Sequence, residues 1–405
     1  MNLDPRQLKD WQIAEAAEQQ APHISEIAAD IGLKREELLS VNRGYAKIDY
    51  HRVLERVNGS PPGAKYIDVS AITPTPLGEG KTTTTLGLVQ GLGRTGRKAG
   101  AAIRQASSGP TFNIKGAAAG GGLSQCIPLT PLSMGLTGDI DAITNAHNLA
   151  MVALTARMQH ERNYDDAKLA ERGLKRLNID PDRIHIKWVL DFCAQSLRNI
   201  VIGRGGKMDG FQMESGFAIT VSSEVMAILS IAKDIKDLRQ RMSRIVVASD
   251  KNGNDITTAD LEVDGAMTAW LLYAMNPTLL QTIEGQPVFV HAGPFANIAI
   301  GQSSIIADMM GTHLLDYHVT ESGFGADIGY EKFWNLKCRL SGLTPDAVVL
   351  VATIRALKMH GGGPAVKPGK KLSEEYIREH LDLVETGCGN LLAHIDVVKK
   401  SGINP

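Results

Sequence analysis

Short apolar runs alternate with longer segments of helical periodicity along most of this chain. Strands are expected where apolar residues are nearly continuous, at residues 65–72, 98–104, 244–249, 287–293, 316–322 and 346–354. Helices are expected between them, for example over residues 142–158 and 223–242. Buried strands separated by helices are typical of a mostly parallel sheet that is covered by helices on both faces. The pattern therefore predicts an α/β fold.

The first 58 residues or so have a different pattern. They predict short helices at 11–20 and 24–33, and the segment NGSPPG at 58–63 marks a boundary. A chain of 405 residues is longer than one hydrophobic core usually supports. We expect two domains: residues 1–285 with the N-terminal helices and a nucleotide-binding α/β domain, and residues 286–405 with a second α/β domain. The second domain is expected to be incomplete, because no strand follows the helix at 387–400.

Charge and cysteine content narrow the class of protein. The 43 basic and 44 acidic residues nearly cancel, so there is no electrostatic argument for a nucleic-acid or membrane partner. The first residues lack the apolar core of a signal peptide, and the longest apolar run, at 347–354, is too short to span a bilayer. The four cysteines are far apart and suit a reducing compartment. We therefore expect a cytoplasmic protein.

The segment TPTPLGEGKTTTT at 73–85 is the strongest chemical signal. It follows a predicted strand and opens a predicted helix, which is the context of a phosphate-binding loop ending in Gly-Lys-Thr. Lys81 would bind the β- and γ-phosphates, and the Thr82 hydroxyl would bind Mg²⁺. Thr75 stands where the usual loop has its first glycine, and Pro74 and Pro76 could fix that turn instead. The alternative is a simple turn followed by a helix that Thr82 or Thr83 caps.

Two further segments contain glycine and basic residues. GLGRTG at 91–96 matches the spacing of a dinucleotide fingerprint, but it follows a helix and precedes a strand, so a glycine helix stop is favoured. Arg104 ends a predicted strand, and Lys115 lies in the loop that follows. At the carboxyl end of a parallel strand both could bind an anionic substrate, although surface ion pairing explains them equally well.

Three more polar residues have a structural and a functional interpretation. Asp139 begins a predicted helix and could bind Mg²⁺ or a substrate amine, but a helix N-cap is the simpler account. His147 lies within a helix and His291 at the end of a strand, and we expect both to be structural.

Eight motifs occur together in a fixed order, at 73–84, 109–116, 136–144, 197–203, 293–299, 320–327, 337–339 and 352–362. They read TPTPLGEGKTTT, GPTFNIKG, LTGDIDAIT, LRNIVIG, GPFANIA, TESGFGAD, KCR and ATIRALKMHGG. From about Ile13 to the last residue the chain resembles formate–tetrahydrofolate ligase (10-formyltetrahydrofolate synthetase). The resemblance implies a P-loop-like α/β fold, a homotetramer, and a requirement for K⁺ or NH₄⁺ as monovalent cation.

The reaction that the resemblance implies joins formate to tetrahydrofolate with ATP, through formyl phosphate. It implies catalytic roles for Lys81, for Arg104 as the residue that holds formyl phosphate, and for Asp139 as an acid at the folate and formyl site. The implied triphosphate-binding residues are Thr75, Pro76, Leu77, Gly78, Glu79, Gly80, Lys81 and Thr82, and Thr82 is the implied Mg²⁺ ligand.

This chain departs from the family pattern at several positions. Gln105 replaces a glutamate, and Gly135, Asp141 and Ile300 replace histidines. Family members also continue into a C-terminal region that supplies aromatic residues for the folate ring. The alternative to an active ligase is therefore a truncated, catalytically impaired nucleotide-binding remnant, or a subunit that needs a complementing chain.

Overall fold

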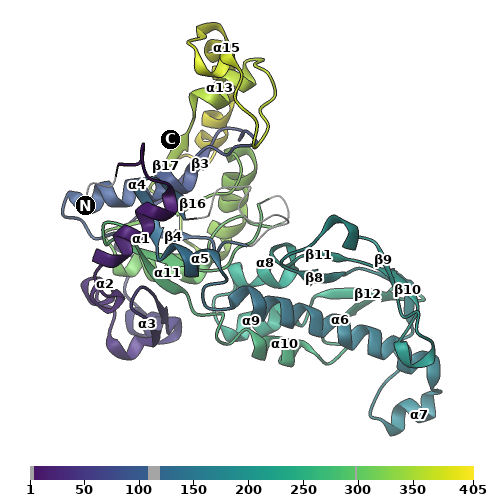
Figure 1. Cartoon of the computed structure of the whole chain (residues 1–405). Helices are drawn as coiled ribbons and strands as arrows, with labels where there is room; N and C mark the ends of the chain where they lie inside the picture. Colours follow the sequence, from purple (N-terminus) through teal and green to yellow (C-terminus); the bar gives the residue numbers. More distant parts are fainter. Residues whose placement is uncertain (1–3, 108–118, 297–298) are drawn as a thin grey trace. The chain divides into compact units, whose positions relative to one another are not determined.

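In the computed structural model, residues 4–107, 119–296 and 299–405 are described (Figure 1). The chain forms two compact units. The first comprises Met1–Ala106, Asn113–Thr137 and Asn276–Pro405, and the second comprises Ser107–Phe112 and Gly138–Met275. The boundary expected between residues 285 and 286 does not coincide with a boundary between these units, because the strands on either side of it, β14 (Thr278–Thr282) and β15 (Pro287–Val290), pair with each other.

A ten-stranded sheet forms the centre of the first unit, within its described residues. Five strands are parallel, in the order β15, β4 (Ala99–Ile103), β16 (Tyr317–Glu321), β3 (Lys65–Ala71) and β17 (Ala347–Val351). The other strands of the sheet are β1 (Leu38–Val41), β2 (Ala46–Ile48), β5 (Gly120–Gly121), β6 (Ser124–Ile127) and β14. The predicted α/β class with a mostly parallel central sheet is confirmed.

Alternation along β3 and β16 separates an apolar face of the sheet from a polar one. Val69 and Val319 pack against helix α4 (Lys81–Arg94) through Leu86 and Val89 in one buried cluster. The residues directly before and after each of these valines point to the opposite face, because successive side chains of a strand alternate. That face is covered by α11 (Ile305–Leu314) and by two π-helical segments, η5 (Ala326–Tyr330) and η6 (Phe333–Cys338).

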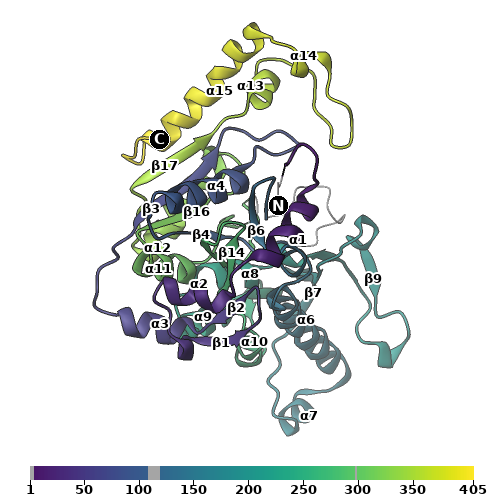
Figure 2. The ribbon, with the colours of Figure 1, turned by 60° about the vertical axis from the view of Figure 1, so that its left-hand side comes forward.

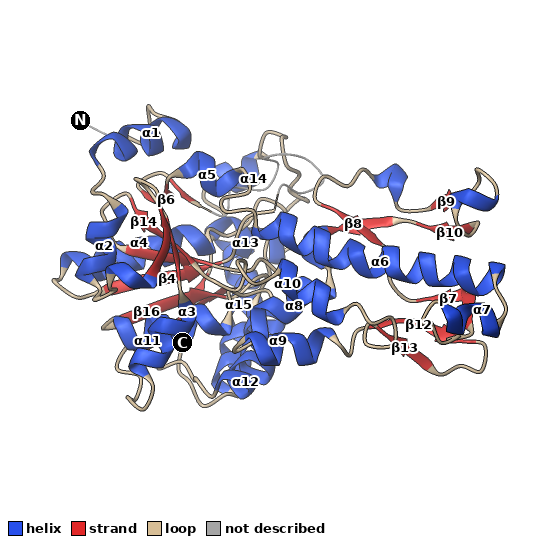
Figure 3. Ribbon diagram, turned by 90° about the horizontal axis from the view of Figure 1, so that it is seen from below, coloured by secondary structure: helices blue, strands red, loops and turns tan. Residues whose placement is uncertain are grey.

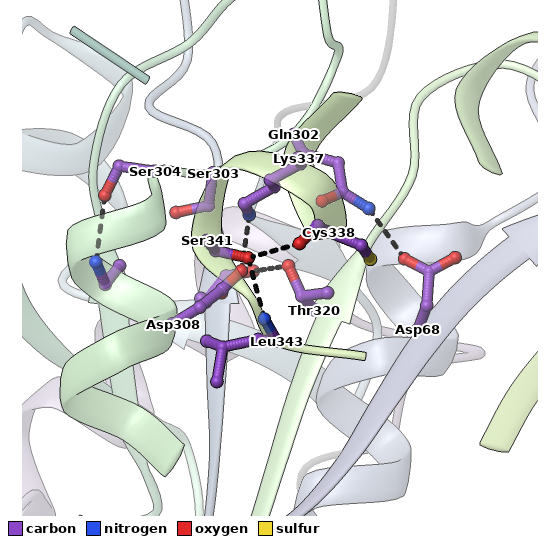
Figure 4. Close-up of polar contacts among 12 residues, drawn as sticks. Asp68, Gln302, Ser303, Ser304, Asp308, Thr320, Lys337, Cys338, Ser341 and Leu343 are labelled. Carbon is purple, nitrogen blue, oxygen red and sulfur yellow. Dashed lines mark hydrogen bonds and ion pairs between the residues drawn. The ribbon is translucent and has the colours of Figure 1, made fainter. Parts of the chain in front are cut away.

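The polar face contains a buried ionic cluster around Asp308 of α11 (Figure 4). The Lys337 ammonium lies 2.5 Å from one Asp308 carboxylate oxygen, which also accepts a hydrogen bond from the Tyr66 hydroxyl. His318 Nε2 lies 2.9 Å from the other oxygen. Burial acts to raise the pKa of Asp308, but the Lys337 charge and the His318 hydrogen bond outweigh it and hold that pKa below its ordinary value.

The remaining helices of the first unit are α1 (Asp10–Gln20), α2 (Ile24–Asp30), η1 (Arg35–Glu37), α3 (Tyr50–Val57), α5 (Leu129–Ser133), α12 (Arg339–Ser341), α13 (Ile354–His360), α14 (Glu374–Ile377) and α15 (Leu381–Lys399). Among them, α13 packs along α15 beyond β17 (Figure 2). The short N-terminal helices are as predicted. The hairpin of β1 and β2 between α2 and α3 was not predicted, because its strands are too short for a periodic signal.

The second unit is built on the long helix α6 (Asp139–Asn163), which packs against α10 (Asp264–Trp270) and β8 (Trp188–Leu190) (Figure 3). Its other elements are α7 (Asp166–Glu171), β7 (Ile179–Ile184), η2 (Gln195–Leu197), β9 (Ile200–Ile202), η3 (Lys207–Asp209), β10 (Met213–Ser215), β11 (Phe217–Ile219), η4 (Thr220–Ser222), α8 (Glu224–Ile231), α9 (Ile235–Met242), β12 (Val246–Asp250) and β13 (Asp255–Thr257).

Two predictions for this unit need correction. The strand expected at 244–249 exists as β12, but it belongs to a separate antiparallel sheet with β13 and β7. The single helix expected over 223–242 is two helices, α8 and α9. The break occurs because the Asp234 side chain accepts a hydrogen bond from Asp237 N and starts a new helix.

Among the helices of the described segments, none combines the length and the apolar character that a membrane crossing requires.

Candidate phosphate-binding site

The segment between β3 and α4 forms a tight loop at the carboxyl edge of the parallel sheet. Gly78 has φ +79° and Gly80 has φ +74°, a backbone region in which glycine is favoured. Gly78 N donates to Thr75 O at 3.0 Å, and α4 begins at Lys81 with Gly80 as its N-cap. The predicted order of strand, glycine-rich loop and helix is confirmed, and the alternative in which Thr82 or Thr83 caps the helix is wrong.

Thr75 closes this loop with its own hydrogen bonds. Its hydroxyl oxygen accepts from Leu77 N at 3.3 Å, and its N donates to the Glu79 carboxylate at 2.7 Å. The second Glu79 oxygen accepts from the hydroxyl of Thr353, which caps α13. Thr75 is not among the residues with positive φ. The position therefore does not require glycine, which explains how the loop forms without the first glycine of the usual pattern.

Helices α13 and α15 hold the outer side of the loop. Arg355 donates to Gly78 O at 2.6 Å. Thr73, two residues before Thr75, bonds residues of both helices. Its N donates to the Asn390 side-chain oxygen at 3.2 Å, its hydroxyl accepts from the Asn390 amide nitrogen at 3.0 Å, and its carbonyl accepts from His360 Nε2 at 2.7 Å. Because both ends of the loop are fixed, the loop is shaped before any ligand binds.

Lys81 and Thr82 extend from the first turn of α4 toward the end of β16. The Thr82 hydroxyl donates to the Glu321 carboxylate at 2.7 Å, and Glu321 is only 2% exposed. Burial lowers the pKa of the Lys81 ammonium from its ordinary value. The nearby Arg104 charge acts in the same direction, and Glu321 opposes them. Two cations, a hydroxyl and a carboxylate therefore converge at the positive end of a helix, where phosphate groups are favoured.

Arg104 follows β4 directly, next to the end of β16. Its Nη1 donates to Pro294 O at 3.3 Å, and a Cβ at Gly323 would lie 3.2 Å from the same nitrogen. The Arg104 Nε is buried and has no hydrogen-bond partner among the described residues. Such a donor is costly to leave unpaired, so an anion at this position would satisfy it.

Asp139 belongs to the second compact unit. It is the first residue of α6 and is 2% exposed. The N-cap of α6 is Gly138, with φ +80°, so the interpretation of Asp139 as the N-cap is wrong. Asp141 lies in the same first turn and is exposed.

Both histidines that were expected to be structural make buried contacts. His147 bonds Ser223 at 2.8 Å and Lys187 O at 2.7 Å, and burial lowers its pKa. His291 bonds Ser304 at 2.6 Å and is fully buried. These partners agree with the structural interpretation.

Two of the departures from the family pattern contact each other. The Gln105 side-chain amide donates to Gly135 O at 3.2 Å, and Gly135 has φ +89°. Ile300 is 6% exposed and belongs to the apolar interior. Lys115, the motif at 109–116, and residues 297 and 298 of the motif at 293–299 lie outside the described residues.

Sequence reasoning did not assign a role to several residues of this site, namely Glu321, Thr353, Arg355, His360 and Asn390. Glu321 lies in the TESGFGAD segment, and Thr353, Arg355 and His360 lie in ATIRALKMHGG. Both segments belong to the family pattern, but nothing in the sequence indicates that either one touches the phosphate loop.

The donor atoms fit a metal ion that is shared with phosphate. In the described part of the chain, no group of three or more histidine, cysteine, aspartate or glutamate residues forms a metal cage. Mg²⁺ usually binds through one or two protein oxygens together with substrate phosphates and water. The Thr82 hydroxyl and the Glu321 carboxylate, 2.7 Å apart beside the loop, supply oxygens of this kind.

Comparison with known proteins gives consistent matches. A family model described as formate–tetrahydrofolate ligase matches residues 8–405. Among curated proteins, formate–tetrahydrofolate ligase of Dehalococcoides mccartyi is 66% identical over 404 residues, covering 100% of this chain and 68% of the relative. The enzyme of Desulforapulum autotrophicum is 64% identical over 409 residues, with 100% and 69% covered. That of Thermodesulfovibrio yellowstonii is 61% identical, with 99% and 68% covered.

Proposed function

The chain belongs to the formate–tetrahydrofolate ligase family, and we propose that it joins formate to tetrahydrofolate with ATP as the source of energy. The observation that carries this proposal is the phosphate loop with Lys81, Thr82 and Arg104 inside a match that extends over residues 8–405. The substrates formate and tetrahydrofolate are taken from the names of the relatives. ATP is inferred from the loop.

In the first proposed step, a formate oxygen attacks the γ-phosphorus of ATP. A P–O bond forms, the bond to the bridging oxygen breaks, and the products are formyl phosphate and ADP. Two anions must approach each other, so the step depends on fixed positive charge. Lys81 and the N-terminus of α4 would hold the transferred phosphoryl group, and Arg104 would hold the formate and then the formyl phosphate.

Mg²⁺ would neutralise charge on the β- and γ-phosphates when it is bound. The Thr82 hydroxyl would be its ligand, and Glu321, which accepts from that hydroxyl, would orient it and accept from metal-bound water. The phosphate loop needs little rearrangement to bind the nucleotide, because Thr75, Glu79 and Arg355 already fix its shape.

In the second proposed step, N10 of tetrahydrofolate attacks the formyl carbon and phosphate leaves. The nitrogen loses a proton, and the carboxylate of Asp139, the acidic residue proposed for the folate and formyl site, would accept it. We further propose a monovalent cation requirement, a homotetramer and a cytoplasmic location. The cation requirement and the homotetramer follow from the family pattern, and the location follows from the four widely spaced cysteines. No residues of this chain are assigned to the cation.

The test is product formation by the purified chain with ATP, Mg²⁺, formate and tetrahydrofolate. Formyl phosphate is trapped with hydroxylamine as the hydroxamate in the absence of the folate, and 10-formyltetrahydrofolate is measured in its presence. Arg104→Ala should remove both products. Lys98→Ala, which changes an exposed lysine just before β4, serves as the control. Stoichiometric ATP binding with no formate-dependent ADP release would instead support the alternative, a nucleotide-binding subunit.

A further inference from the structure

The last residue of β16 and the two residues after it touch both halves of the phosphate site. Glu321 accepts the Thr82 hydroxyl, and Gly323, two residues later, lies against Arg104. Gly323 N also donates to Gly301 O at 2.9 Å. The position of this short turn, residues 321–323, therefore sets the distance between the metal side and the formate side of the site.

Ser322 lies between Glu321 and Gly323 in the sequence, and its side chain points to the opposite face of the sheet, as alternation along the chain requires. Its N donates to Val69 O at 2.9 Å, which fixes the backbone against β3. Its hydroxyl lies 2.8 Å from each carboxylate oxygen of Asp68. The turn thus has one anchor in the backbone and a second in a side chain of the neighbouring strand.

Gln302 completes this anchor. Its side-chain amide donates to Asp68 Oδ1 at 2.8 Å (Figure 4). The same amide nitrogen also donates to the Ser322 hydroxyl at 2.7 Å. All three side chains are fully buried. A close triangle of polar groups of this kind has few alternative arrangements, since each lost contact would leave a buried polar atom unpaired.

A structural explanation alone does not account for a carboxyl at this place. Burying a carboxyl group in the layer between a sheet and its covering helices costs free energy, and an apolar side chain could fill the same volume at lower cost. The carboxyl does, however, accept from the hydroxyl of Ser322, which follows Glu321 directly in the sequence. The contacts of Asp68 therefore affect the position of Glu321, on the other face of the sheet.

We propose that Asp68, together with Gln302, is a positioning residue for the phosphate site. Through Ser322 it holds the 321–323 turn so that Glu321 meets the Thr82 hydroxyl and the metal that it binds. This inference rests on the proposed function, because it concerns the Mg²⁺–ATP complex. It goes beyond that function because it assigns part of the affinity for the Mg²⁺–ATP complex to a carboxyl that touches neither substrate nor metal.

The experiment compares ATP binding with and without Mg²⁺ in the complete chain, by calorimetry, with an excess of chelator for the metal-free arm. Ser322→Ala removes the link and keeps the backbone of the turn. It should weaken Mg²⁺–ATP binding roughly tenfold, the loss that one buried hydrogen bond produces, and change metal-free ATP binding less than about twofold. Asp68→Ala should give the same pattern, and the double variant should be no weaker than the single ones.

Thr312→Val is the matched control. Thr312 is also buried, and its hydroxyl donates to Asp308 O at 2.8 Å within α11. It should lower stability without changing the ratio of the two ATP affinities. A purely structural role for Ser322 and Asp68 would give this same result in their variants.

The possible failures can be told apart. Unchanged Mg²⁺-dependence in Ser322→Ala, with Mg²⁺-dependent ATP binding intact in the wild type, overturns this inference alone. A wild-type chain that binds ATP equally well with and without Mg²⁺ overturns it as well and also contradicts the metal role in the proposed function. Equal losses in both arms would mean that the turn supports the loop as a whole, which contradicts the positioning of Glu321.

Discussion

Replacing Lys337 with methionine tests the buried ionic cluster behind the sheet. Methionine keeps most of the volume of the lysine stem but removes the ammonium that lies 2.5 Å from Asp308. Both side chains are only 1% exposed, so water cannot replace the lost partner. The Asp308 carboxylate would retain the Tyr66 hydroxyl and His318 as partners.

The expected loss in unfolding free energy is about 3–5 kcal/mol, the cost of leaving one member of a buried pair without its counter-charge. A surface pair gives the comparison. Lys65 lies 2.7 Å from Asp346, but these side chains are 65% and 39% exposed. Lys65→Met should therefore cost no more than about 1 kcal/mol. Protection of the β16 amides in native-state hydrogen exchange measures both variants in the same strand.

The dependence on pH provides an independent check. Because the folded-state pKa of Asp308 is lowered, its contribution is present above the unfolded pKa and is lost as pH falls through the folded value. The difference between wild type and Lys337→Met should therefore shrink in acid. Asp308→Asn in the Lys337→Met background should recover part of the loss. A cost for Lys337→Met equal to that of Lys65→Met would refute the account of this cluster.

Three further changes give separate tests. Asp68→Asn should gain stability relative to wild type as pH rises from about 4 to 8, by at most ~1.4 kcal/mol per pH unit. Burial raises the pKa of Asp68 to about 8, so the folded wild type retains a proton that the unfolded chain releases. Urea unfolding at several pH values measures the difference in unfolding free energy between the two proteins. A difference that does not change with pH would contradict this explanation. Gly329→Ala should cost about 1–3 kcal/mol because its Cβ would lie 1.8 Å from a backbone carbonyl oxygen, whereas Gly91→Ala, with open space around it, should be neutral or stabilising in thermal unfolding. Glu79→Ala removes the acceptor of Thr75 N and should weaken ATP binding roughly tenfold in calorimetry; unchanged affinity would show that the loop does not depend on this contact.

The parallel strands could be predicted because burial on both faces leaves a continuous apolar run in the sequence. β4, β15 and β17 lie within such runs, whereas β3 and β16 lie within the predicted ranges but alternate apolar and polar residues. The polar residues that point to the α11 face were not distinguished, because Asp68 and His318 each stand singly between two apolar residues. The antiparallel strands of the second unit gave weak signals, since several contain only three residues.

The phosphate loop was predictable because strand, loop, Lys81 and Thr82 are contiguous in the chain. The partners of the loop were not. Glu321 comes within 2.7 Å of Thr82 only because β16 lies between β3 and β4, although the two residues are 239 positions apart. Asn390 of α15 reaches Thr73 across 317 positions because α15 packs against α13 and β17. No pattern within one segment reports such contacts; they follow from the order of strands in the sheet and from the packing of helices beside it.

The central claim is that this phosphate site transfers the γ-phosphoryl group of ATP to formate. The most direct measurement is ADP release by the wild-type chain, with and without formate, beside Lys81→Ala at equal folded concentration. We predict formate-dependent release by the wild type and a loss of about 10²–10³ in kcat for Lys81→Ala, because a positioned charge on the transferred group is removed. Equal formate-dependent ADP release by Lys81→Ala and wild type would contradict the claim.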